Sequence, residues 1–310
     1  MPEPSSPVRR GRLPRIGAAV VVMLAVAAYV AVQYATGSRP TPRCAVVAAG
    51  HGEGAGARYE FTAEQAANAA TISAVGTSRG MPERAVTIAL ATALQESGLR
   101  NVRHGDRDSL GLFQQRPSEG WGSAEQIMDP AYAAERFYAR LDKVPGYSRL
   151  PLTVAAQRVQ RSGYPQAYAK HEPDATLLSA SLTGRAAATL TCEGGPGGPA
   201  KTGTPARVEA ALVRDFGRDV APARGRDRHS VRVPVPASVA SAQGGERQRG
   251  WELAQWAVAN SSALRIERVA YAGREWVARE TGNGWRRTPA AGASPASAQA
   301  RDEVRIVTAQ

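Results

Sequence analysis

The feature that most constrains this chain is a run of 20 uncharged residues near its N-terminus, from Ile16 to Ala35. At about 1.5 Å of rise per residue, this run is long enough to cross a bilayer as one helix. Basic residues favour the cytoplasmic side, and more of them precede the run than follow it. They are Arg9, Arg10, Arg12 and Arg15 before it, and Arg39 and Arg43 after it. The sequence therefore predicts a single-pass plasma-membrane protein with a cytoplasmic tail at 1–15, a transmembrane helix at 16–35 and the bulk of the chain outside the cytoplasm.

A cleaved signal peptide is the alternative for this segment, because Ala35-Thr36-Gly37 is similar to a small-residue cleavage site. The apolar core of a signal peptide is usually shorter, at about 7–15 residues, which favours a signal anchor that stays in place. A single span cannot enclose a path for a solute. A transport role would therefore need partner subunits, and the sequence identifies no protein partner.

Charge and composition do not indicate nucleic-acid binding, although the chain is basic. The formal net charge is +12, and only three of the 39 basic residues are lysines, at Lys143, Lys170 and Lys201. Many arginines together with abundant alanine and glycine are typical of GC-rich coding sequences. No basic stripe with interleaved aromatic residues occurs, so no nucleic-acid partner is predicted.

A chain of 310 residues suggests roughly two folded domains. Composition places their boundaries in stretches rich in proline and glycine. The predicted parts outside the membrane are a stalk at 36–57, a mainly α-helical domain at 58–192, a linker at 193–206 and a small α+β domain at 207–310. The two cysteines, Cys44 and Cys192, lie near the edges of the helical domain. In an oxidising compartment they would form a disulfide that ties its ends together, and two free thiols are the alternative.

Apolar residues at helical spacing predict the helices of 58–192, and alternating residues predict the strands that follow. The expected helices run from Thr62 to near Gly80, from Pro82 to a stop at Gly98, from Ala131 to Leu141, from Pro151 to Gln160 and from about Ala167 to Leu178. Farther on we expect a helix from Pro205 to Phe216, an amphipathic helix over Gly250–Asn260, and strands at Ser230–Val235, Ile266–Tyr271, Glu275–Ala278 and Glu303–Thr308.

One carboxylate, Glu96, falls in the last turn of the helix that stops at Gly98. The negative end of the helix dipole and partial burial both disfavour its ionised form. A carboxyl group that stays protonated near neutral pH is what a general acid requires. The alternative is a structural role, in which Glu96 caps the helix or pairs with Arg100 or Arg103.

Glu96-Ser-Gly-Leu99, followed by Ser109-Leu-Gly-Leu-Phe-Gln114 and then Pro117, resembles the motif pair of the lysozyme-like superfamily. The greatest similarity is to soluble-lytic-transglycosylase (SLT) domains, whose pattern reads Glu-Ser, Gly-Leu-Met-Gln and Pro. This resemblance implies a lysozyme-like fold and peptidoglycan glycan strands as substrate. Glu96 would act as the one acid/base at the bond between N-acetylmuramic acid and N-acetylglucosamine, without a cofactor. A lysozyme-type hydrolase would usually need a second carboxylate, for which Asp106 and Asp108 are the candidates.

The same resemblance suggests residues that bind the sugar. Ser109, Gln114 and Gln115 would line the cleft, and Trp121 would either stack on a sugar ring or fill a small core. SLT domains also carry an Ala-Tyr-Asn-Ala-Gly segment, whose counterpart here would be Ala155–Gly163, with Gln157 in place of the amide. This segment departs from the pattern.

The C-terminal half is similar to a domain of secreted actinobacterial wall proteins that has a DD-carboxypeptidase-like zinc fold. The shared features are the Trp251–Asn260 helix, Trp-Glu-Leu-Ala-Gln-Trp-Ala-Val-Ala-Asn, and the hairpin that ends at Trp276. Tetrahedral zinc needs at least three protein ligands, and His229 is the only histidine of this half. No metal site is predicted, and we expect a non-catalytic binding or packing module.

Two functions remain open on these grounds. The first is a membrane-anchored enzyme of the lytic transglycosylase type that cleaves peptidoglycan in an actinobacterial cell wall. The second is a lysozyme-like protein without activity that binds glycan or serves as an envelope scaffold.

Overall fold

The computed structural model describes residues 19–29, 43–49, 56–164, 166–193, 203–225, 227–235, 245–278, 280, 284–288 and 302–309. The chain divides into two compact units, Met1–Pro40 and Thr41–Gln310. In the first unit residues 19–29 form a helix, while the remainder of the predicted 16–35 span lies outside the described residues. Over the ranges given above, no helix combines the length and the apolar character needed to cross a membrane.

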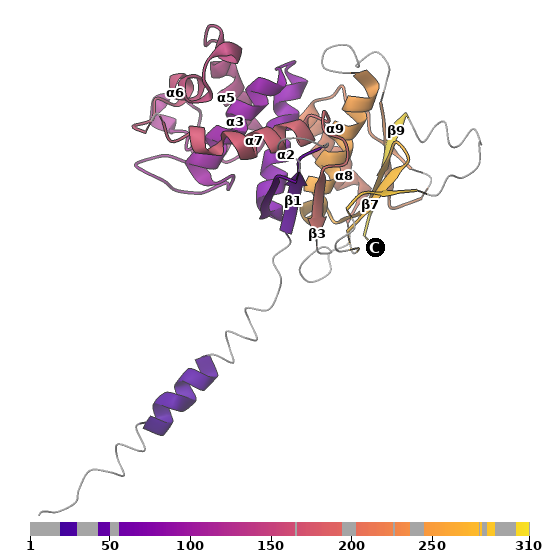
Figure 1. Ribbon diagram of the computed structural model, residues 1–310, viewed down its shortest axis with the longest axis horizontal. Helices are drawn as coiled ribbons and strands as arrows, with labels where there is room; N and C mark the ends of the chain where they lie inside the picture. The colour runs from indigo at the N-terminus through magenta and orange to yellow at the C-terminus, as the bar shows by residue number, and fades with distance from the viewer. Residues whose placement is uncertain are drawn as a thin grey trace, which may run out of the picture. The chain divides into compact units, whose positions relative to one another are not determined.

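The first part of the second unit is a cluster of helices (Figure 1). The helices are α2 (Ala63–Ser78), α3 (Glu83–Ser97), α4 (Ala124–Ile127), α5 (Pro130–Leu141), α6 (Leu152–Gln160) and α7 (Glu172–Leu182). Single 3-10 turns lie at Pro117–Glu119, Tyr147–Arg149 and Ala169–His171. This arrangement confirms a mainly helical first part.

The helix ends follow from local sequence. Thr62 caps α2 and forms a capping box with Gln65, which satisfies free N–H groups at the helix start. Gly98 ends α3 in the left-handed conformation at φ 62°, where glycine carries no steric cost. The last helix is an exception, because α7 begins at Glu172 instead of Ala167. The 3-10 turn at Ala169–His171 precedes it, and Pro173 suits the first turn of a helix.

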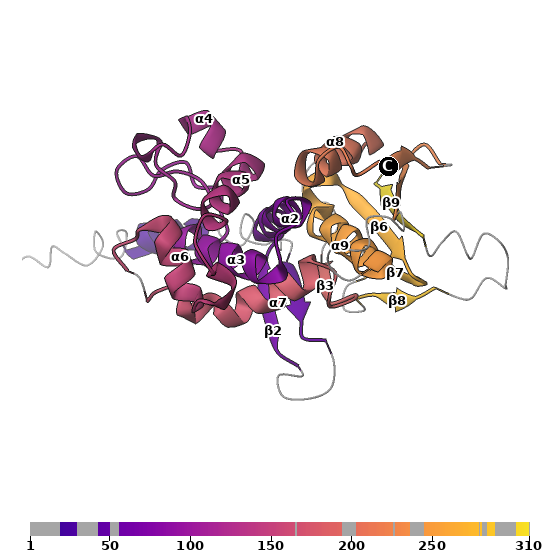
Figure 2. The ribbon, with the colours of Figure 1, turned by 90° about the horizontal axis from the view of Figure 1, so that it is seen from above.

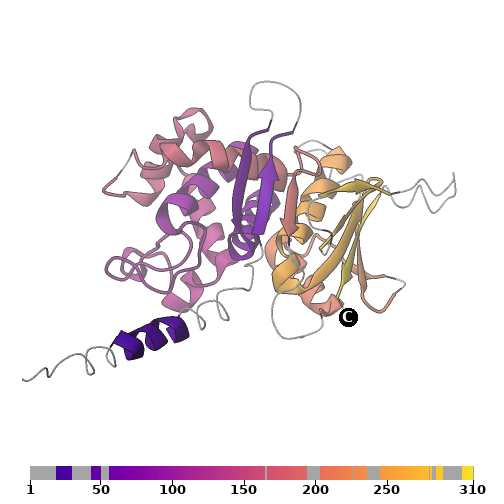
Figure 3. The ribbon, with the colours of Figure 1, turned by 60° about the horizontal axis from the view of Figure 1, so that its bottom comes forward.

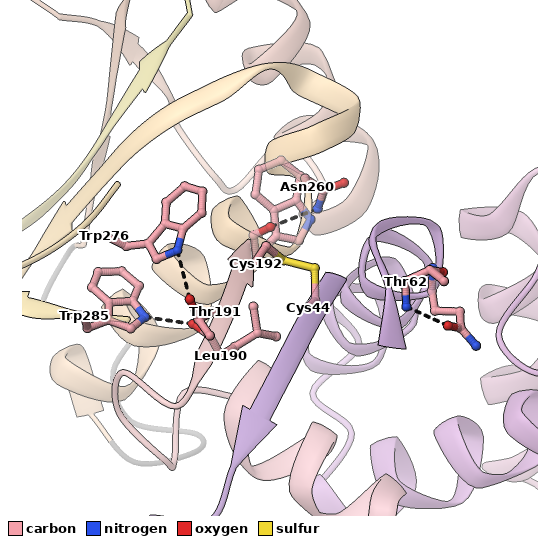
Figure 4. The surroundings of a disulfide bond; sticks show 10 residues. Cys44, Thr62, Leu190, Thr191, Cys192, Asn260, Trp276 and Trp285 are labelled. Carbon is pink, nitrogen blue, oxygen red and sulfur yellow. Dashed lines mark hydrogen bonds between the residues drawn. A yellow bond between two sulfur atoms is a disulfide. The ribbon is translucent and has the colours of Figure 1, made fainter. Parts of the chain in front are cut away.

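A three-stranded antiparallel sheet joins the two ends of the helical part (Figure 3). Its order is β2 (Arg58–Thr62), β1 (Arg43–Val47) and β3 (Leu190–Glu193). Cys44 lies opposite Cys192 in the register of β1 and β3, and the two form a disulfide, which confirms the predicted pair (Figure 4). The strand β1 falls inside the stretch predicted as a stalk at 36–57, so that prediction is corrected here. Cys44, Ala45 and Val46 are buried, and this short apolar run is long enough for a strand.

The second part of this unit is a six-stranded antiparallel sheet with helices on it. The strand order is β4-β5-β9-β6-β7-β8, so that β9 pairs with both β5 and β6. The strands are β4 (Ala223–Arg224), β5 (Ser230–Pro234), β6 (Ile266–Tyr271), β7 (Arg274–Val277), β8 (Arg286–Arg287) and β9 (Glu303–Thr308), and the helices are α8 (Pro205–Phe216), α9 (Gly245–Ala259) and α10 (Ser261–Leu264). The predicted helix to Phe216 and the four predicted strands are confirmed within one residue at each end.

The helix α9 differs from its expected amphipathic character, because every residue from Gly250 to Ala259 is buried. It lies between α2 on one side and strands β6 and β9 on the other (Figure 2). The approach to the sheet is close: a Cβ atom on Gly250 would lie 1.9 Å from the ring of Tyr271. A helix covered on both sides needs apolar or fully bonded residues all round, which explains the pattern.

The polar residues of α9 bind the helical part. The side chain of Gln255 is fully buried, and its Oε1 accepts hydrogen bonds from Ser181 Oγ at 2.8 Å, Thr189 N at 3.0 Å and Leu190 N at 3.1 Å. Its Nε2 donates to Ser181 O and Ala186 O. One amide thus satisfies the turn between α7 and β3, where unpaired groups would be costly.

A second buried link runs through Asp215 on α8. Its Oδ2 accepts from Thr71 Oγ1 on α2 at 3.0 Å and from Trp256 Nε1 on α9 at 2.8 Å. Around these links, one continuous hydrophobic core extends from Cys44 to Ile306. The helical part and the six-stranded sheet therefore share a core, and α2 contacts helices of both parts.

Candidate functional site

A cleft of about 1100 Å³ opens in the helical part beside Glu96. Its walls come from the end of α3, the loop between α3 and α4, the end of α5 and the end of α6 with the residues after it. The lining residues are Glu96, Asp106, Arg107, Ser109, Gln114, Arg116, Glu119, Trp121, Arg140, Lys143, Val144, Arg158, Val159, Gln160, Arg161, Ser162, Gly163 and Tyr164. A cleft of this size accommodates several sugar rings or a short peptide.

Glu96 is half-buried in the last turn of α3. The buried Tyr168 donates its hydroxyl hydrogen to Glu96 Oε1 at 2.7 Å. Burial raises the pKa of Glu96 above its ordinary value, although hydrogen bonds from Tyr168 and Gln160 oppose the rise. Glu96 forms no ion pair with Arg100 or Arg103, all three of which lie in the described part of the chain. The environment therefore favours the protonated acid expected from the sequence.

The residue after Glu96 fixes the neighbouring loop. Ser97 Oγ donates to Leu112 O at 2.8 Å, which holds the Gly-Leu-Phe-Gln turn against the end of α3. The turn is closed by a β-bridge between Leu110 and Gln115. Gly111 has φ 75°, and a Cβ atom there would lie 2.8 Å from Ile127 O. The two motifs singled out in the sequence thus lie together because Ser97 ties the turn to α3, while Gly111 lets the turn approach α4.

The structure divides the predicted sugar-binding residues into two groups. Ser109 and Gln114 line the cleft. Gln115 is instead 1% exposed and donates from Nε2 to Ala133 O at 3.0 Å, so it braces the loop against α5. Gln157 donates to Ser162 O at 2.7 Å and is not among the cleft residues. Both amides are tied to backbone carbonyls, which corrects their assignment to the substrate.

Of the two alternatives for Trp121, the structure favours the core role. The indole is only 5% exposed, and the guanidinium of Arg140 lies 3.5 Å from the ring centroid. This cation–π contact covers one face of the ring, and the low exposure leaves little of the other face open to a sugar. Tyr164 is the aromatic residue of the cleft that solvent reaches, at 78% exposure.

The two candidate second carboxylates also differ. Asp108 accepts hydrogen bonds from Arg116 Nε at 2.8 Å and Ser118 N at 2.9 Å, and these hold its pKa far below the usual range. Asp108 is not among the cleft residues, whereas Asp106 is. If a second carboxylate takes part in the chemistry, Asp106 is the remaining candidate.

Two residues of the site were missed in the sequence. Tyr168 contacts Glu96 directly, and Gln160 lies at the end of α6, with Nε2 donating to Phe113 O at 2.7 Å. The sequence analysis predicts Ala155–Gly163 as the counterpart of the Ala-Tyr-Asn-Ala-Gly segment of SLT domains. An Ala-Tyr pair occurs a few residues later, in Ala167-Tyr168-Ala169. That pair was the available signal for Tyr168.

We expect Tyr168→Phe to raise the pKa of Glu96 further, because the hydroxyl stabilises the ionised carboxylate. The pKa of Tyr168 is itself raised, first by burial and then by the charge of Glu96. A carbon-13 NMR titration of the glutamate carboxyls would measure the shift, with the Glu96 signal identified by its loss in Glu96→Gln. Tyr59→Phe, on β2 and without a hydrogen bond to Glu96, is the control and should leave the midpoint unchanged. An unchanged midpoint in Tyr168→Phe would contradict the described contact.

The part built on the six-stranded sheet was predicted to lack a metal site. Within the residues that the structure covers, no group of three or more histidine, cysteine, aspartate or glutamate side chains is arranged to hold a metal ion. His229 uses its backbone oxygen to accept hydrogen bonds from Thr308.

One family model matches part of the chain. A family model described as VldE, C-terminal domain, matches residues 231–298. No curated protein matches the chain. The matched range includes α9 and strands β6, β7 and β8 but ends before β9. The cleft around Glu96 lies outside it.

Proposed function

We propose that this protein is a membrane-anchored enzyme of the lytic transglycosylase type that cleaves the glycan strands of peptidoglycan. The observation that carries the proposal is the environment of the Glu96 carboxyl group. It is a half-buried carboxyl without an ion-pair partner in the described part of the chain, its pKa is raised by burial, and it opens onto a large cleft. Lysozyme-like resemblance of the two motifs beside it supplies the substrate class.

In this proposal Glu96 acts twice. It first protonates the glycosidic oxygen between N-acetylmuramic acid and N-acetylglucosamine, for which a raised pKa is required. It then accepts the proton of the muramyl 6-hydroxyl, whose oxygen closes a 1,6-anhydro ring on the same sugar. Tyr168 holds Oε1 throughout and stabilises the carboxylate formed between the two steps. Because the ring closes within the substrate, no second carboxylate is needed.

Two features support the proposed location. The helix at 19–29 lies within the uncharged run 16–35, which we propose continues as a signal anchor in the plasma membrane. The disulfide Cys44–Cys192 is of the kind that persists in oxidising compartments. Both features are consistent with a short N-terminal tail in the cytoplasm and a large part that faces the cell wall.

A catalytically inactive glycan-binding or scaffold protein is the second candidate. It is favoured by the contact of Gln157 with Ser162 O, because this contact takes Gln157 away from the sugar-positioning role expected of it. Such a protein would use the same cleft to bind peptidoglycan without cleaving it.

Digestion of purified peptidoglycan by the full-length protein separates these functions. Products identified by mass spectrometry as 1,6-anhydro-muropeptides would establish the transglycosylase. Reducing-end products would indicate a hydrolase in which Asp106 supports Glu96. Sedimentation with peptidoglycan and no released product would overturn the enzyme proposal in favour of the scaffold.

A further inference from the structure

The cleft beside Glu96 carries an excess of positive charge. Six cationic and three acidic side chains line it. Two of the cations have partners: Arg116 pairs with Asp108 and Glu119, and Arg140 donates to Glu119 O and stacks on Trp121. The other four are exposed, and none pairs with an acidic residue of the described chain; they are Arg107, Lys143, Arg158 and Arg161.

Three of these four form what we call the cationic wall, defined as Lys143, Arg158 and Arg161. Lys143 follows α5, Arg158 lies in the last turn of α6, and Arg161 is its C-cap. A helix C-terminus attracts cations, so the dipole of α6 accounts for part of this placement. Lys143 lies just after the C-terminus of α5, where the same effect applies, but helix dipoles do not account for the convergence of all three on one cleft.

The like charges also act on each other. The pKa of Arg140 is lowered first by burial and then by the neighbouring charges of Arg136 and Arg161. Unpaired cations gathered around a concave surface create a positive potential that attracts anions. An anion bound at the wall would relieve this repulsion.

We propose that the cationic wall binds acidic groups carried by the glycan strand. The preferred substrate is then a strand substituted with carboxylates or phosphates, and not a neutral polymer of N-acetylated sugars. This inference rests on the proposed function and specifies its substrate. Carboxylates would come from the stem peptides of peptidoglycan, and phosphates from polymers attached to the wall. The exposed ring of Tyr164 lines the same cleft and offers a flat apolar surface to the sugar that carries the group.

Binding measured without cleavage tests the proposal. The full-length Glu96→Gln protein would be incubated at low salt with three materials coupled to beads: peptidoglycan that retains stem peptides and attached polymers, the same material without polymers, and strands stripped of peptides as well. If phosphates are recognised, binding falls when the polymers are removed. If carboxylates are recognised, it falls when the peptides are removed. We expect a loss of about fivefold at the relevant step.

Two double variants show whether the wall is responsible. Arg158→Gln with Arg161→Asn removes two wall charges, and asparagine tolerates the left-handed backbone of residue 161 at φ 53°. Both changes are made in the Glu96→Gln protein, which is called the parent. This variant should bind substituted strands as weakly as the parent binds stripped strands. Arg218→Gln with Arg274→Gln removes the same charge at exposed arginines outside the cleft and should bind as the parent does.

Equal binding of all three materials by the parent would overturn the inference, as would parent-like binding by the wall variant. Neither result would affect the cleavage proposal, which is judged by the products that the wild type releases. Conversely, an absence of products would overturn the proposal of an enzyme, but the preference for acidic strands could still be measured.

Discussion

Replacing Glu96 with glutamine is expected to lower the rate of glycan cleavage at least ~100-fold, which is the usual contribution of a positioned general acid. Glutamine preserves the shape of the side chain and can still accept the hydroxyl hydrogen of Tyr168, but it cannot transfer a proton. The measurement is the rate of muropeptide release by the full-length protein. Glu64→Gln, an exposed glutamate in the first turn of α2, is the matched control and should retain wild-type activity.

The stability of Glu96→Gln checks the same environment independently of activity. A carboxyl whose pKa is raised in the folded protein stabilises the fold below its unfolded pKa, and this stabilisation is lost as the pH rises through the folded pKa. Because Glu96 ionises at a lower pH in the unfolded chain than in the folded protein, it opposes folding at neutral pH, and glutamine removes that cost. We expect the variant to unfold at a higher temperature than the wild type near pH 7 and at a similar one near pH 4. A lower unfolding temperature near pH 7 would indicate a structural role for Glu96.

Removing the disulfide with Cys44→Ala and Cys192→Ala is expected to lower the free energy of unfolding by about 4 kcal/mol. The two cysteines are 148 residues apart in sequence, and closing so long a loop removes much of the conformational entropy of the unfolded chain. Tryptophan fluorescence suits the measurement, because Trp276 and Trp285 both donate hydrogen bonds to β3, next to Cys192 (Figure 4). Guanidinium unfolding of the wild type and the double variant would give the difference.

A reducing agent provides the control for this second prediction. It should lower the stability of the wild type to that of the double variant and leave the variant unchanged. A difference below about 1 kcal/mol between the oxidised wild type and the variant would show that pairing of β1 with β3 persists in the unfolded chain.

Helix and strand positions could be predicted because their signals are local. The capping box at Thr62, the stop at Gly98 and the alternation of Ile266–Tyr271 all act within a few residues. The strand β1 was missed because it lies between stretches rich in proline and glycine, which favoured the prediction of a stalk. Its strand character depends on pairing with β3, far along the chain.

The position of Glu96 could be predicted from the sequence, but the residues that surround it in the cleft could not. Glu96 was found because the helix pattern places it at a helix end. The choice between Gln157 and Gln160 could not be made, since the two lie one turn apart on α6 and only the packing decides which reaches the cleft. Similarly, Asp108 pairs with Arg116, and Trp121 contacts Arg140. No rule of sequence spacing predicts either pair.

The position of β9 constrains the order in which the fold can be completed. This strand separates β5 from β6, yet it follows both in the chain. Until it is synthesised, β5 and β6 each leave an edge of unpaired N–H and C=O groups open to other chains. During synthesis the chain would thus expose two unpaired strand edges that only β9 can cover. A chain that stops before Glu303, such as the segment matched by the family model, keeps both edges open and is expected to aggregate.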